Sequence, residues 1–250
     1  MVEGLSTGAD PAPLIYLSPR GARTGAELAS RFDNVGICDS NQEVAERAAV
    51  LVVAVRPEDA TEVLSGIRLH DDSVVISVMA GVSHATLAGL VGSSRPVVRA
   101  IPLPAVRHRR SSTLTYPANE SAASLFDRLG GSLPVADEDS FAALSAVSGT
   151  VTGYLQYLSL IAAWASRHGV DADQAERYVR SIFADLGDAL ADPDRSLAQL
   201  LRDHETPGGF NEQFRRNWLA EQNADALGEV LDTLLVRLAV SPGSRSRTPG

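Results

Sequence analysis

The sequence lacks the features that mark membrane, secreted and disulfide-stabilised proteins. It has no apolar run close to the roughly 18 residues that a membrane-spanning helix needs. Its first residues have neither the basic start nor the apolar stretch of a secretory signal. Cys38 is the single cysteine, which excludes an internal disulfide framework and fits a reducing compartment. We therefore expect a cytoplasmic protein that does not insert into membranes.

Basic residues are in the minority. The chain has 22 Lys and Arg residues against 31 Asp and Glu residues, which gives a formal net charge of -9. This balance argues mildly against nucleic-acid binding, because such proteins usually present a basic face. The one basic cluster, residues 107–110, is short, and such runs are most often solvated loops. The five histidines are scattered without the spacing of metal ligands, so we expect no metal site.

A glycine-rich phosphate-binding turn is also missing. Gly4 and Gly8 do not have the spacing of G-x-G-x-x-G, and no strand-like segment precedes them. Taken alone, this absence counts against a dinucleotide-dependent enzyme.

The first half of the chain does contain a regular alternation of short β-branched runs with segments of helical periodicity. The runs are nearly continuous in apolar residues, as in strands that are buried on both faces. They are LIYLS (14–18), LVVAV (51–55), VVISV (74–78), VVRAI (97–101), TLTY (113–116) and SLPVA (132–136). This order predicts an α/β domain over residues 1–137, with a mostly parallel sheet covered on both faces.

After residue 137 the strand-like runs stop and the pattern becomes helical. A long helical pattern is interrupted near Ser148 and Gly149, and Asp171 has the position of a helix cap. We expect an all-helical domain over residues 138–240 and a disordered, low-complexity tail over residues 241–250. The helical segments are rich in apolar residues, which favours a helix-mediated homodimer. Packing within one chain explains the same pattern, and the pattern alone does not decide between the two.

The loop after the first strand-like run carries a hydroxyl and two arginines, Ser18, Arg20 and Arg23. NAD-preferring domains place an acidic residue at the end of their second strand, whereas arginines suit the 2′-phosphate of NADPH because guanidinium groups pair with phosphate oxygens. A surface turn with two solvated arginines is the alternative.

Several further motifs stand at the ends of buried strands or in a turn. Strand ends with small residues or proline let a flat ligand approach the backbone, and the amides of a TPGG turn can hold a carboxylate. The motifs are LVVAVRP (51–57), SVMAG (77–81), VRAIPLP (98–104), SGTVTGY (148–154) and TPGGFN (206–211). In this order they resemble the pyrroline-5-carboxylate reductase family, over nearly the whole chain.

The resemblance implies a Rossmann-like NADP-binding domain without its first strand and glycine-rich turn, followed by a helical dimerisation domain. Residues 1–5 resemble the end of the family's first helix, which roughly twenty residues would precede. Loss of that central strand would leave two neighbouring strand edges unpaired. A start codon assigned too far downstream would produce such a chain, and a truncation is the alternative.

The resemblance also implies an activity, the reduction of the cyclic imine 1-pyrroline-5-carboxylate to L-proline with hydride from NADPH, in a homodimer or higher oligomer. Each implied site residue has one of three roles: cofactor binding, substrate carboxylate binding or proton donation. The cofactor residues are Ser18, Arg20, Arg23, Asn41, Ala54, Arg56 and Pro57; the substrate residues are Gly208, Gly209, Phe210 and Asn211; the proton donor is Tyr157. A tyrosine that only packs between helices is the alternative for Tyr157.

The sequence departs from the family's motifs at positions expected near the substrate or the nicotinamide. Leu103 replaces an asparagine, Phe210 and Asn211 replace paired threonines, and residues 151–153 replace G-P-A. These differences suggest a relative that acts on a different imine. The missing glycine-rich turn favours another possibility, a non-catalytic helical dimerising protein. A nucleic-acid-binding module has only residues 107–110 to support it.

Overall fold

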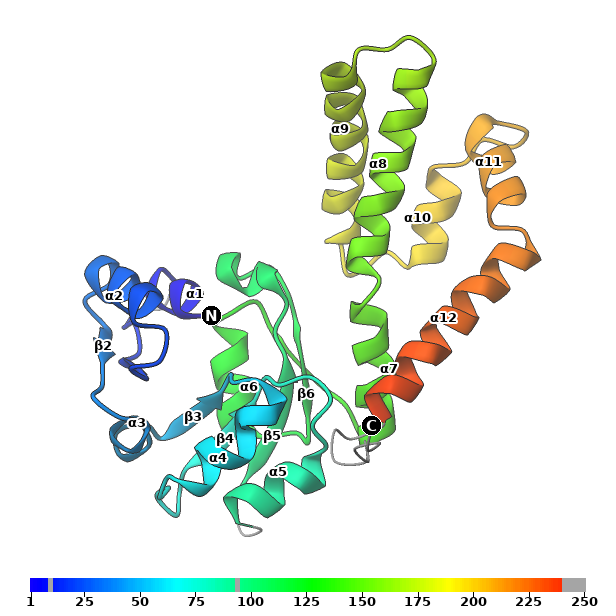
Figure 1. The fold of residues 1–250 in the computed structure, drawn as a ribbon. Coiled ribbons are helices and arrows are strands. Elements are labelled where there is room, and N and C mark those ends of the chain that lie inside the picture. Colours follow the sequence, from blue (N-terminus) through cyan, green and yellow to red (C-terminus); the bar gives the residue numbers. More distant parts are fainter. Residues whose placement is uncertain (9–10, 93–94, 240–250) are drawn as a thin grey trace, which may run out of the picture. The chain divides into compact units, whose positions relative to one another are not determined.

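The computed structural model describes residues 1–8, 11–92 and 95–239. The chain forms two compact units, one of residues 1–145 together with the end of the last helix from Leu235, and one of Ala146–Leu234. Figure 1 shows the strands in the first of these and only helices in the second. The predicted tail over residues 241–250 lies outside the described residues.

The strands of the α/β unit follow the predicted apolar runs, with one addition. They are β1 (Ile15–Leu17), β2 (Val35–Ile37), β3 (Val50–Val53), β4 (Val74–Ser77), β5 (Val97–Ile101), β6 (Thr113–Tyr116) and β7 (Ser132–Pro134). The five-stranded sheet has the order β3-β4-β5-β6-β7, and only the β5–β6 pairing is antiparallel. The prediction of an α/β fold with a mostly parallel sheet is therefore confirmed.

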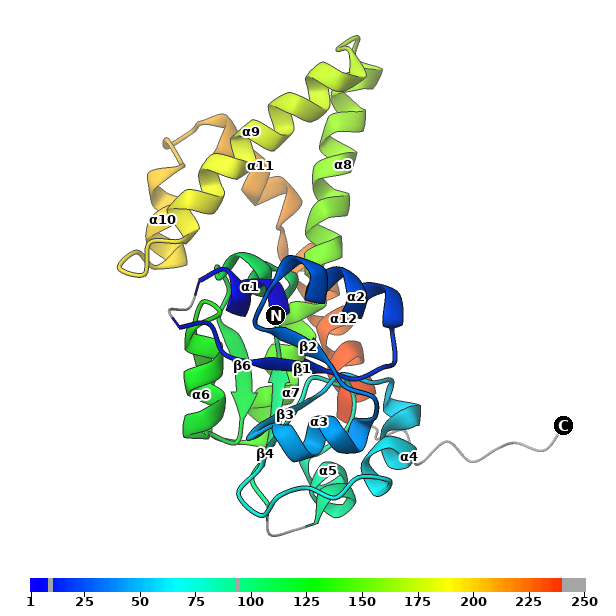
Figure 2. The same ribbon diagram turned by 90° about the vertical axis from the view of Figure 1, so that its left-hand side faces the viewer.

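The sheet is divided into two parts. Strands β1 and β2 pair in parallel as a separate two-stranded sheet, while β3 forms one edge of the larger sheet. Figure 2 shows β1 and β2 in front of the larger sheet. The strand pattern predicted one sheet, so this division is a correction, although the resemblance implied two unpaired neighbouring edges. The sequence analysis also missed β2, because its three residues include Gly36 and form too short an apolar run.

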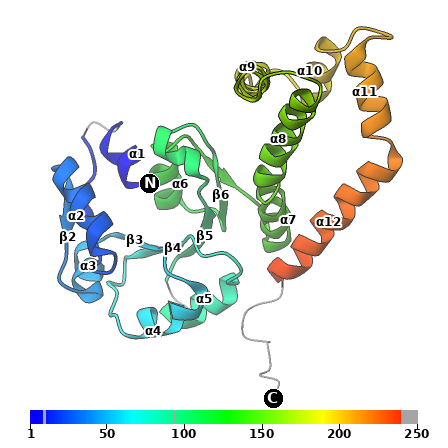
Figure 3. The ribbon, with the colours of Figure 1, turned by 45° about the horizontal axis from the view of Figure 1, so that its top comes forward.

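Helices cover the larger sheet on both faces, as Figure 3 shows for α4 and α5 on one side and α6 on the other. The helices and 3-10 turns of this unit are α1 (Val2–Ser6), α2 (Ala22–Arg31), α3 (Asn41–Arg47), η1 (Pro57–Asp59), α4 (Ala60–Ser65), α5 (His84–Val91), η2 (Pro104–His108), α6 (Glu120–Asp127) and α7 (Glu138–Ser148). Successive side chains of β4 point to opposite faces: Val75 belongs to a buried cluster that includes residues of α3, α4 and α5, and Ile76 to one that includes residues of α1 and α6.

Helix ends in the α/β unit follow the capping residues in the sequence. The Ser83 hydroxyl accepts a hydrogen bond from the Thr86 amide at the start of α5, as expected of an N-cap. Ser40 and Asn119 cap α3 and α6 in the same way. These caps fix where each helix leaves the strand before it.

The second unit begins near the end of α7 and consists of α8 (Val151–Arg167), α9 (Ala172–Leu190), α10 (Leu197–Asp203), α11 (Phe210–Trp218) and most of α12 (Glu221–Ala239). The predicted interruption near Ser148 and Gly149 separates α7 from α8, and Asp171 caps α9. Ser196 and Gln199 form a capping box at α10. Among the described residues, no helix is long and apolar enough to cross a membrane.

Candidate functional site

Of the cofactor residues expected after β1, Ser18 and Arg20 lie in the loop that leads into α2 and Arg23 lies in the first turn of α2. Ser18 is half-buried, whereas Arg20 and Arg23 are exposed. Gly21 adopts a left-handed conformation with φ of 84° and stands at the N-cap of α2, which has no side-chain cap. The first-turn amides of α2 and two guanidinium groups thus lie close together in the chain, an arrangement that suits a phosphate.

A second loop follows β3. Ala54 and Arg56 are exposed and Pro57 begins η1. The two loops are joined by an ion pair: Nη2 of Arg20 lies 2.9 Å from Oδ2 of Asp59, at the end of η1. This pair shows that the carboxyl ends of β1 and β3 face the same edge of the unit, where nucleotides bind in open α/β sheets. Asn41 is the first residue of α3, after the carboxyl end of β2.

Tyr157 lies on α8, in the helical unit. Its ring packs edge-on against Phe183 of α9, with 6.2 Å between the ring centroids, and Tyr154 makes a similar contact one turn earlier. Burial raises the pKa of Tyr157 above its ordinary value of 10.0, with a smaller contribution from Tyr154. The hydroxyl of Tyr157 therefore keeps its proton at neutral pH.

The TPGG turn joins α10 to α11. Gly208 has a left-handed φ of 74°, which favours glycine, and Gly209 is the N-cap of α11. The Gly208 amide donates to Oε2 of Glu212 at 2.6 Å, and the Gly209 amide donates to the Thr206 carbonyl at 2.8 Å. The two glycine amides that we expected to hold a substrate carboxylate thus already have partners within the chain.

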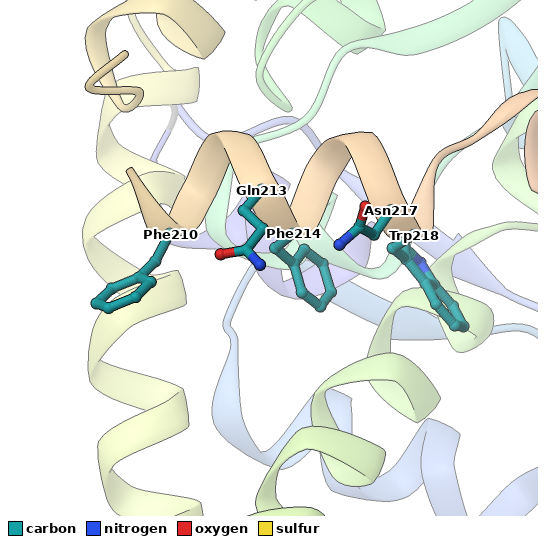
Figure 4. A pocket seen from close by; sticks show the side chains of 5 residues that line it. All are labelled: Phe210, Gln213, Phe214, Asn217 and Trp218. Atoms are coloured by element: carbon teal, nitrogen blue, oxygen red, sulfur yellow. The ribbon is translucent and has the colours of Figure 1, made fainter. Parts of the chain in front are cut away.

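The helix after this turn presents an aromatic face. Phe210, Phe214 and Trp218 follow one another at four-residue spacing along α11, with Gln213 and Asn217 between them (Figure 4). They line an open hollow of about 410 Å³, and the rings of Phe214 and Trp218 stack with 6.4 Å between centroids. Phe210 is 91% exposed, so this face packs little against its own chain.

Known proteins resemble the chain in both sequence and fold. The profile of the family described as "NADP oxidoreductase coenzyme F420-dependent" matches residues 4–81. The pyrroline-5-carboxylate reductase of Pseudomonas aeruginosa is 28% identical over 230 residues, which cover 88% of this chain and 84% of that protein. The chain is thus similar to pyrroline-5-carboxylate reductases over most of its length.

Solved structures agree with this family at the level of the fold. A pyrroline-5-carboxylate reductase from Coxiella burnetii superposes with a TM-score of 0.80 at 22% identity, covering 95% of this chain and 92% of that one. The Plasmodium falciparum pyrroline carboxylate reductase, solved with NADP bound, superposes with a TM-score of 0.66 at 18% identity, covering 82% and 83%. At such identities the likeness extends to the fold alone.

Within the pyrroline-5-carboxylate reductase fold, the expected site residues fall into two groups. The residues from Ser18 to Pro57 that we assigned to the cofactor lie in the α/β unit, most of them in the loops after β1 and β3. Tyr157 and residues 208–211 lie in the helical unit. In the described ranges, no group of three or more His, Cys, Asp or Glu side chains could hold a metal ion. Arg107 of the basic cluster pairs with Glu3 of α1 at 2.8 Å.

The sequence did not reveal three acidic side chains that contact Arg20, the Gly208 turn or the buried Arg99 of β5. Asp59 and Glu212 lie next to motifs but belong to none of them. The third is Glu138, whose Oε1 lies 2.6 Å from Nη1 of the buried Arg99 and also accepts from the His84 amide. Asp59 and Glu212 could have been noticed because each lies a few residues from a motif. Exposed acidic residues are common in this chain, however, so this proximity did not single them out.

Proposed function

We propose that this protein is an NADPH-dependent reductase of a cyclic imine, by default 1-pyrroline-5-carboxylate, with L-proline as the product. The similarity to the Pseudomonas aeruginosa reductase over most of both chains carries this proposal. The Arg20–Asp59 pair supports it, because it brings the loops after β1 and β3 to one edge of the α/β unit.

The residues at that edge fit NADPH. Ser18, Arg20 and Arg23 would hold the 2′-phosphate beside the uncapped first turn of α2. Asn41 would lie near the adenosine ribose. Ala54, Arg56 and Pro57 would border the nicotinamide half, since an exposed alanine leaves room for a flat ring. The bound cofactor supplies the hydride for the reduction.

The helical unit would orient the substrate and supply a proton. Tyr157 is our candidate for the proton donor to the imine nitrogen, because a tyrosine hydroxyl carries a proton at neutral pH and can donate it in a hydrogen bond. Gly208, Gly209 and the backbone at Phe210 and Asn211 are our candidates for holding the substrate carboxylate, at the start of α11, whose N-cap is Gly209. Protonation makes the imine carbon more electrophilic, so both roles favour hydride transfer.

We also propose that the protein acts as a homodimer assembled through its helical unit. Large apolar side chains of α8, α9 and α11 are exposed in the single chain, among them Leu160, Trp164, Tyr178, Phe210 and Trp218. A soluble chain rarely leaves such an area uncovered, and a second copy offers a matching apolar surface.

Titration of the 250-residue chain with NADPH and with NADH by calorimetry tests the function. We expect micromolar binding with NADPH preferred, and an Arg20→Gln variant with NADPH affinity lowered about tenfold and NADH affinity little changed. Arg110→Gln, at another exposed arginine, is the control and should bind like the wild type.

A folded chain that binds neither nucleotide would contradict the reductase. It would favour the alternative, a non-catalytic helical dimerising relative.

A further inference from the structure

Glu212 places a carboxylate at the turn where the proposed function puts the carboxylate of the substrate. It stands three residues after the N-cap of α11, and its Oε2 accepts the hydrogen bond of the Gly208 amide at 2.6 Å. Its Oε1 lies 2.6 Å from Nη2 of Arg216, one turn further along the helix. The carboxylate of Glu212 is therefore held on both sides, by the turn and by its own helix.

The rest of the turn is engaged within the chain in the same way. The Gly209 amide donates to the Thr206 carbonyl, and Nδ2 of Asn211 donates to the His204 carbonyl at 2.7 Å. A ligand carboxylate that approaches Gly208 meets the negative charge of Glu212 and must displace it from the amide. Two carboxylates that compete for the same amide repel each other. The ligand must also replace the hydrogen bond that Glu212 makes with the Gly208 amide.

We propose that Glu212 is a specificity-determining residue that lowers the affinity of this site for imines bearing a carboxylate, relative to imines without one. The inference rests on the proposed function, because that function assigns the turn to the substrate. It means that the wild-type protein discriminates little between 1-pyrroline-5-carboxylate and neutral cyclic imines. The substrate class then extends to cyclic imines that have no carboxylate.

A purely structural role for Glu212 is the competing explanation, since a glutamate in the first turn often reaches back to cap a helix. The Glu212→Gln variant distinguishes the structural role from the specificity role. A glutamine side chain keeps an acceptor for the Gly208 amide and hence the cap, but removes the negative charge. A structural role predicts no substrate-dependent effect of this change, whereas a specificity role predicts one.

The test measures steady-state reduction of 1-pyrroline-5-carboxylate and of 1-pyrroline, which lacks the carboxylate, by the wild type and by Glu212→Gln. We expect the variant to lower KM for 1-pyrroline-5-carboxylate about tenfold and to leave KM for 1-pyrroline unchanged. Glu176→Gln is the matched control, because Glu176 forms the same kind of i,i+4 pair, with Arg180 on α9. Equal KM changes for both substrates, or none, would overturn the proposal.

A binding measurement separates failure of this proposal from failure of the proposed function. The chemical shift of the Gly208 amide is followed by NMR while L-proline, the product with a carboxylate, is added to each protein. We expect the shift to saturate at about tenfold lower L-proline in Glu212→Gln than in the wild type. If neither imine is reduced but this difference is seen, the reductase fails, while the finding that Glu212 lowers the affinity of the turn for a carboxylate stands. If the two titrations coincide, the role of Glu212 is refuted even in an active reductase.

Discussion

In the α/β unit the apolar side chains form two buried clusters on either side of the larger sheet, whereas the helices of Ala146–Leu234 leave many of theirs exposed. The reason is geometric. A sheet has two faces, and each is closed here by helices of the same chain. The helical unit has no sheet to pack on, and its larger buried side chains include only Val179 and Leu200. The α/β unit thus buries its large apolar side chains within itself, whereas the helical unit leaves many of its own exposed.

Removal of one large side chain from each unit should have very unequal effects on stability. Phe126 of α6 is fully buried, so Phe126→Ala should lower the free energy of unfolding by about 3–5 kcal/mol. Phe210→Ala, at the exposed start of α11, should change it by less than about 0.5 kcal/mol at protein concentrations low enough to keep the chain monomeric. Urea denaturation followed by circular dichroism measures both. Similar losses would mean that the exposed aromatic face is packed after all.

The second prediction concerns chemistry rather than stability. If cofactor binding belongs to the α/β unit and proton donation to the helical unit, Tyr157→Phe should lower kcat about 100-fold without changing NADPH affinity. Tyr154→Phe is the matched control, because that ring packs on the same Phe183. An unchanged kcat in Tyr157→Phe would leave Tyr157 as a packing residue and require another proton donor.

The third and smallest effect is expected at the exposed surface of the helical unit. Leu160 of α8 is 57% exposed, and Leu160→Glu should weaken the proposed homodimer about tenfold, because it places a charge in an apolar interface. The same change at Leu133 of β7, which is 49% exposed in the α/β unit, should leave assembly unchanged. Sedimentation velocity at several concentrations gives both dissociation constants. A monomeric wild type would contradict the homodimer.

Much of the fold could be predicted from local pattern. The runs 51–55, 74–78 and 97–101 became strands β3, β4 and β5 because buried parallel strands need continuous apolar residues. Asp171 caps the helix that it was expected to cap, because the capping hydrogen bond joins residues only three apart. In contrast, β2 was missed, because its pairing with β1 stabilises a run too short to stand out alone.

The candidate site was predictable to a lesser degree. The sequence pointed to Arg20 and to the TPGG turn, because a guanidinium group can bind phosphate and glycines form tight turns in any fold. It did not point to Asp59, which lies 39 positions after Arg20 yet pairs with it at 2.9 Å. Nor did it show that Gly208 and Glu212 share a hydrogen bond, since that depends on the left-handed turn at Gly208.

The α/β and helical halves, several helix caps and the resemblance to pyrroline-5-carboxylate reductases can be read from the amino-acid sequence, since each depends on residues that are near neighbours in the chain. The division of the sheet between β1 and β3, the Arg20–Asp59 and Arg99–Glu138 pairs, and the carboxylate at Gly208 become visible only in the folded chain. The physical reason is that hydrogen bonds and ion pairs act over a few ångströms of space. Which distant residues come that close is set by how the whole chain packs.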